Sequence, residues 1–135
     1  MRYAVVTGRL LFSIVFILAS AGHFSEGTIE SAVGHGVPLA RLLVPFSGVI
    51  ALMGGLSILV GYQARVGAAL LVVFLVPVTF FMHNFWAAPP ALFGIEKVMF
   101  MKNLTMLGGA LLISYFGAGP VSLDAFARGQ FDPNR

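Results

Sequence analysis

Four long apolar stretches, separated by short polar segments, decide what this chain can fold into. They cover about residues 4–24, 42–62, 66–82 and 103–116, and a polar tail follows at 117–135. A helix that spans a bilayer needs about 20 mostly apolar residues. The chain is 59% hydrophobic and only 10% charged, so a soluble domain of this length would expose large apolar patches. The sequence therefore predicts one transmembrane domain over residues 1–135, an all-α, antiparallel, up-down four-helix bundle.

Basic residues predict the orientation of this bundle, because cytoplasmic loops carry an excess of Lys and Arg. With the N-terminus inside, the basic residues on the cytoplasmic side are Arg2, Arg9, Arg65, Arg128 and Arg135. Those on the outer side are then Arg41, Lys97 and Lys102. Both termini are therefore predicted to be cytoplasmic. The first stretch is similar to a signal peptide, but Arg9 interrupts its apolar centre, so we expect the chain to retain it.

Composition and motifs exclude several functions. The chain has no cysteine, which excludes disulfides, thiol redox chemistry and thiolate metal sites within it. The net charge of +3 comes without a run of Lys or Arg, so we predict no nucleic-acid partner. The sequence contains no P-loop, dinucleotide fingerprint, zinc-protease helix or nucleophile elbow.

Small and polar residues inside the stretches predict how the helices pack. Ser47, Ala51 and Gly55 follow one another at four-residue steps, which predicts a contact line for a neighbouring helix. In the first stretch, Arg9 begins a polar stripe that should face the bundle interior. We interpret Arg9 as a structural anchor that either reaches the cytoplasmic headgroups or pairs with Asp124 of the tail.

A second group of polar residues is predicted to gather at the outer end of the bundle. At this outer end the first and third apolar stretches end and the fourth begins. The group comprises His23, His83, Asn84, Trp86, Glu96, Lys102 and Asn103. Donors and titratable groups that converge at a helical mouth suit a small polar ligand or a quinone headgroup. Interfacial Trp and His are also common membrane anchors, which is the structural alternative.

Metal chemistry is a minor alternative for the same residues. Two histidines on different helices, such as His23 and His83, are a pattern that binds haem axially. Three methionines lie in the same region of the chain as His83: Met82, Met99 and Met101. Methionine thioethers and histidine imidazoles are ligands that bind copper. Methionine more often serves packing, and nothing in the sequence sets the separation of the histidines. We therefore predict no metal site and, as the one candidate cofactor, a quinone.

The chain resembles the DoxX family over nearly its whole length. In the first half, the resemblance rests on Gly8-Arg9-Leu10-Leu11, His23-Phe24, Gly36-Val37-Pro38, Gly54-Gly55 and Arg65. In the second half, it rests on His83-Asn84-Phe85-Trp86, Lys102-Asn103-Leu104, Gly108-Gly109, Gly119-Pro120 and Ser122-Leu123-Asp124. Each motif is weak alone, whereas their order and spacing together are fairly specific.

The resemblance implies a compact four-helix protein of the bacterial cytoplasmic (inner) membrane. The family is named after a small subunit linked to a thiosulfate:quinone oxidoreductase, and some members associate with membrane redox enzymes. It thus implies an accessory or quinone-contacting subunit with redox partner proteins. Two alternatives are a non-enzymatic scaffold that binds a protein or lipid and, less favoured, a small-molecule transporter. Four short helices make a narrow bundle, so transport would need a homo-oligomer.

Overall fold

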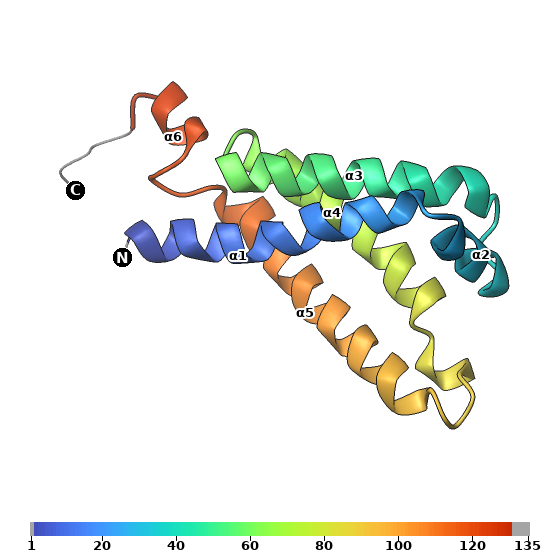
Figure 1. The fold of residues 1–135 in the computed structure, drawn as a ribbon. Helices are drawn as coiled ribbons and strands as arrows, with labels where there is room; N and C mark the ends of the chain where they lie inside the picture. The colour runs from blue at the N-terminus through green and yellow to red at the C-terminus, as the bar shows by residue number, and fades with distance from the viewer. Residues whose placement is uncertain (1, 131–135) are drawn as a thin grey trace.

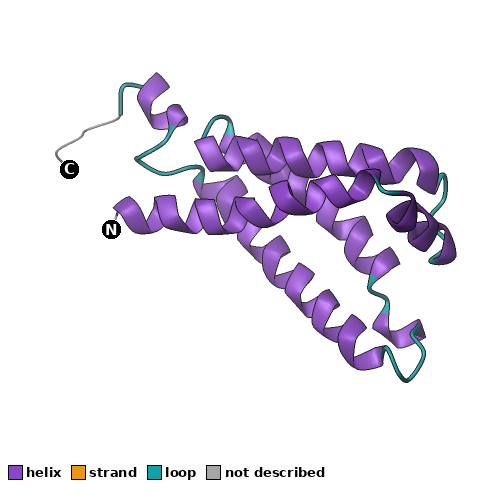
Figure 2. Ribbon diagram, viewed as in Figure 1, coloured by secondary structure: helices purple, strands orange, loops and turns teal. Residues whose placement is uncertain are grey.

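The structure, a computed structural model, describes residues 2–130 and is all-helical over them (Figures 1 and 2). Its elements are α1 (Arg2–Ser20), η1 (Ala21–Phe24), α2 (Glu26–Gly34), α3 (Ala40–Val60), α4 (Ala64–Met82), η2 (Phe85–Ala87), α5 (Phe93–Phe116) and α6 (Leu123–Ala127). Four of the described helical segments are long and apolar enough to cross a membrane: Tyr3–Phe24, Ala40–Val60, Ala64–Ala87 and Phe93–Phe116. The predicted fold class is therefore confirmed, while the direction of insertion stays a prediction.

The long helices pack in the order α1, α3, α4, α5. Helix α3 lies between α1 and α4, and α5 packs against α4. Figure 1 shows α5 and the later part of α4 slanting away from α1 and α3 toward the end that carries η2. The bundle is thus closed at the end that holds α6 and opens toward the end that holds α2 and η2.

Glycines bring α3 close to both of its neighbours. A Cβ on Gly55 would lie 2.9 Å from Ile17 Cγ1 of α1, and one on Gly54 would lie 2.9 Å from the carbonyl oxygen of Gly67 in α4. Ala51, also on α3, is fully buried in the core of the bundle. The predicted contact line of α3 is confirmed at Ala51 and Gly55, because small side chains let helix backbones approach in lipid, where no hydrophobic force drives them together.

Arg9 and Asp124 lie at the end of the bundle where the segment after α5 meets the turn between α3 and α4, and in the described chain they do not form the ion pair that was one of the two alternatives for Arg9. The Arg9 guanidinium is buried and donates to the carbonyl oxygens of Ala118 and Val121, each at 2.9 Å. The Asp124 carboxylate accepts from the backbone N–H groups of Gln63 and Ala64, at 2.8 and 3.1 Å. Arg9 therefore does not reach out to the headgroups but binds carbonyls of the loop between α5 and α6, while Asp124 satisfies N–H groups at the start of α4 that have no partner within the helix.

The fourth span differs most from its prediction. Helix α5 begins at Phe93, whereas the sequence predicted a loop from His83 to Lys102 and a span from Asn103. The charged pair Glu96-Lys97 lowers the hydropathy of this segment without breaking the helix, since Glu96 lies in the first turn, where a carboxylate is favourable. Asn103 consequently lies near the middle of α5. The predicted tail also gains a short helix, α6.

Candidate functional site

A cavity of about 520 Å³ lies where the bundle opens, between α1 and α3 on one side and α4 and α5 on the other. Helix α2 covers one edge, since Thr28 and Ala32 line the cavity. Most of the lining is apolar, from residues such as Phe16, Ile50 and Phe74. Ligand sites in proteins typically have this size and combine apolar walls with a few polar groups.

Asn103 is the most unusual residue of this lining. The residue is only 4% exposed, its side chain makes no hydrogen bond within the described part of the chain, and its amide atoms stay accessible from the cavity. A carboxamide has two N–H donors and an accepting oxygen, and burying such a group without partners is costly. Because α5 is about 36 Å long at 1.5 Å per residue, this amide lies at membrane depth. An amide that faces a cavity and has no hydrogen-bond partner among residues 2–130 is suited to bind a ligand or water.

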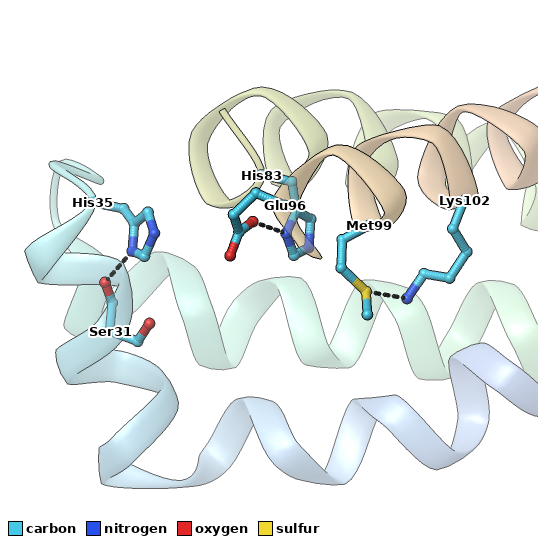
Figure 3. A network of polar contacts seen from close by, with 6 residues as sticks. All are labelled: Ser31, His35, His83, Glu96, Met99 and Lys102. Atoms are coloured by element: carbon cyan, nitrogen blue, oxygen red, sulfur yellow. Dashed lines mark hydrogen bonds and ion pairs between the residues drawn. The ribbon is translucent and has the colours of Figure 1, made fainter. Parts of the chain in front are cut away.

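Lys102 precedes Asn103 and lines the same cavity. In the described chain, its ammonium group donates one hydrogen bond, to the sulfur of Met99 at 3.4 Å, and a thioether is a weak acceptor (Figure 3). Within residues 2–130, no carboxylate forms an ion pair with it. The cavity wall therefore carries a positive charge that no acidic side chain neutralises, which favours a ligand with exposed oxygen atoms.

His83 and Glu96 form the polar contact at the end of the cavity (Figure 3). His83 Nδ1 lies 2.8 Å from Glu96 Oε2, which joins the end of α4 to the first turn of α5. A carboxylate oxygen without a proton only accepts hydrogen bonds, so Nδ1 is the donor in this contact. Both side chains are about one-fifth exposed, at 23% and 21%, so water reaches this pair.

The structure brings together four of the six predicted ligand-binding residues. His23, His83, Lys102 and Asn103 all line the cavity. Nδ1 of His23 lies 3.0 Å from the carbonyl oxygen of Ala19, and the His23 ring packs against the ring of Phe74.

Asn84 and Trp86 do not line the cavity, so their role in ligand binding stays a prediction. Helix α4 ends at Met82, so the chain leaves the helical face that would have aligned Trp86 with His83. Trp86 instead packs against Phe80, Phe85 and Phe100 and is 58% exposed. Sequence reasoning also missed the apolar walls on α3 and α4, because a search for chemically active residues does not find a surface made of aliphatic side chains.

Comparisons with known proteins place this geometry in a family. The DoxX family model matches residues 4–84, which include α1 to α4 and His83. The chain belongs to the DoxX family. Among curated relatives, this DoxX-family protein is 34% identical to the inner membrane protein YqjF of Escherichia coli (strain K12), over 89% of this chain and 88% of the relative. It is 25% identical to the inner membrane protein YphA of the same strain, over 89% and 87%.

A eukaryotic relative matches the chain over only a third of its own length. The DoxX-family chain is 28% identical to the ER-derived vesicles protein ERV29 of Saccharomyces cerevisiae, over 90% of this chain and 33% of that protein. No solved structure matches the chain. With two relatives named as inner membrane proteins and four spanning helices, this DoxX-family protein is a multi-pass protein of the cytoplasmic membrane.

Proposed function

We propose that this protein is a quinone-contacting subunit of a membrane oxidoreductase system and that the cavity between α1, α3, α4 and α5 holds the quinone headgroup. The observation that carries the proposal is the amide of Asn103, which lines an apolar cavity and has no hydrogen-bond partner among the described residues. A quinone offers carbonyl oxygens that accept hydrogen bonds and an isoprenoid tail that belongs in lipid. The cavity has polar groups on α5 and apolar walls on the other helices, so it suits both parts.

The polar residues have distinct roles in this proposal. The N–H groups of Asn103 donate to a carbonyl oxygen, and the Lys102 ammonium stabilises negative charge on the headgroup. A bound quinone would accept two electrons and two protons, the electrons coming from a partner redox protein. The His83–Glu96 pair is about one-fifth exposed to water, and His83 lines the cavity, so in this proposal the pair passes protons between water and the cavity.

Quinone binding to the purified protein tests this function. We expect Asn103→Leu and Lys102→Ala each to weaken binding of decylubiquinone about tenfold, since each removes roughly one hydrogen bond or charge contact. Intrinsic fluorescence quenching of the purified protein, titrated with decylubiquinone, measures the affinity. Asn84→Ala is the matched control, because Asn84 precedes η2 and does not line the cavity. Its affinity should equal that of the wild type.

The alternative is a non-enzymatic scaffold or assembly partner that uses the same polar mouth to bind a protein or lipid. The exposed aromatic cluster around Trp86 favours it, because Trp and Phe on a surface often anchor partners. If decylubiquinone binding is undetectable, or is equal in the wild type and in Asn103→Leu, the quinone proposal is wrong. If the set of proteins that co-purify with Asn103→Leu and Lys102→Ala then differs from the set that co-purifies with the wild type, the scaffold function is supported.

A further inference from the structure

A second cavity lies at the opposite end of the bundle, between the turn that joins α3 and α4 and the segment that follows α5. Its volume is about 680 Å³, and its walls come from the start of α4, the end of α5 and the segment that includes α6. None of its lining residues belongs to the first cavity. The chemistry of this end is therefore a separate question from quinone binding.

Two arginines line this second cavity, Arg65 from α4 and Arg128 from the end of α6. Within residues 2–130, neither guanidinium forms an ion pair. Asp124 is the one carboxylate in the cavity wall, and both of its oxygens already accept backbone hydrogen bonds from the turn. Nε of Arg128 donates a hydrogen bond to Oε1 of Gln130 at 3.2 Å, so the other N–H groups of its guanidinium remain available. The cavity thus holds two positive charges and many free N–H donors.

The backbone around the cavity is held in place. Gly117 has φ +80°, and a Cβ there would lie 3.3 Å from Arg65 Nε, so the glycine leaves room for the guanidinium beside the chain. Arg9 holds the next residues through the carbonyl oxygens of Ala118 and Val121. The arginines therefore line a wall of fixed shape and not a loose tail.

Charge and depth identify the class of ligand. Arg65 lies one residue inside α4 and Phe116 ends α5, so the cavity is at the ends of the membrane-spanning helices. In the described chain, this end carries Arg9, Arg65 and Arg128 against Asp124 alone. The opposite end mixes acidic and basic residues, including the exposed pair of Arg41 with Glu26. Basic pockets between helices at the cytoplasmic boundary are typical sites for anionic lipid headgroups.

We propose that the cavity between α4, α5 and α6 binds a phosphate group through Arg65 and Arg128, and that an anionic phospholipid of the bilayer supplies it. The guanidinium fork matches the oxygens of a phosphate, and paired donors make such contacts strong. The apolar ends of α4 and α5 beside the cavity give the acyl chains of the same lipid a place in the membrane.

Lipid selectivity of the full chain in detergent micelles tests this site. Native mass spectrometry measures how many phosphatidylglycerol and phosphatidylcholine molecules stay bound at equal concentrations. We expect the wild type to prefer phosphatidylglycerol, and Arg65→Gln and Arg128→Gln each to reduce that preference about fivefold. Arg65→Lys/Arg128→Lys, which keeps both charges, should retain part of it. Arg41→Gln is the control, since it removes one arginine at the opposite end.

Each outcome decides the proposal. An unchanged preference in Arg65→Gln/Arg128→Gln, with helix content equal to the wild type by circular dichroism, would overturn it. So would an equal loss in Arg41→Gln, because the preference would then follow net charge. Inorganic phosphate separates the sources of the ligand: we expect 5 mM phosphate to leave bound phosphatidylglycerol in place. Displacement at that concentration would assign the site to a soluble phosphate and refute the lipid.

Discussion

Replacing Arg9 with methionine should release the segment after α5 from the end of the bundle. Two hydrogen bonds from a buried guanidinium hold this segment, and each such bond contributes about 1.5–3 kcal/mol. We therefore expect the local stability to fall by about 3 kcal/mol, which corresponds to roughly a hundredfold loss of protection. Hydrogen exchange at the amide of Asp124 measures it, because this N–H donates to the carbonyl oxygen of Gly61 at 2.8 Å.

Two variants make the Arg9 experiment specific. Arg9→Lys keeps the charge but loses the planar fork that reaches two carbonyls at once, so its protection should be intermediate. Arg41→Met removes an arginine whose side chain is exposed and whose contact with Glu26 is 3.7 Å long, so it should leave the Asp124 amide protected. Unchanged exchange in Arg9→Met would show that the segment is held by something other than this guanidinium.

Gly54→Val should have the second large effect, on the packing of α3 against α4. A Cβ at this position would meet Leu71 at 2.7 Å and the carbonyl oxygen of Gly67 at 2.9 Å. Leu71 can move, but the backbone of α4 can retreat only if the helices separate. Overpacking of this kind costs about 3 kcal/mol. Unfolding in mixed micelles of increasing SDS content, followed by circular dichroism, measures the loss.

The matched control for Gly54 is Gly108 in α5. A Cβ there meets nothing within 4 Å, so Gly108→Val should change the unfolding free energy by less than about 0.5 kcal/mol. Equal losses in the two variants would mean that the cost comes from the helix propensity of valine. The close approach of α3 and α4 would then not be what holds these helices together.

Hydropathy was sufficient to predict three of the four spans within a few residues. Helices α1, α3 and α4 are nearly free of charge, and lipid leaves an uncharged apolar segment no alternative to a helix. The fourth span was misplaced because α5 continues past the apolar stretch into a segment with Glu96 and Lys97. A window of mean hydropathy finds the part of a helix that lies in lipid and not the turns that extend beyond it.

The candidate site was predictable in its residue types and less so in its depth. Sequence spacing brought His83, Lys102 and Asn103 to one end of the bundle, and all three line the cavity. It did not predict that Asn103 is buried near the middle of α5, because that depends on where the helix begins. Nor did it predict that Trp86 lies outside the cavity lining, since α4 ends at Met82 and the chain turns away there.

Cross-linking with a photoreactive quinone tests the central claim most directly. The purified protein in lipid nanodiscs is irradiated with an azido-quinone, and the labelled peptides are identified by mass spectrometry. We expect labels on the stretch of α5 around Lys102 and Asn103 and on the facing residues of α1 and α4, and we expect unlabelled decylubiquinone to suppress them. Labels confined to lipid-facing residues such as Leu111 and Leu112, or labels that excess quinone does not suppress, would contradict a quinone site in this cavity.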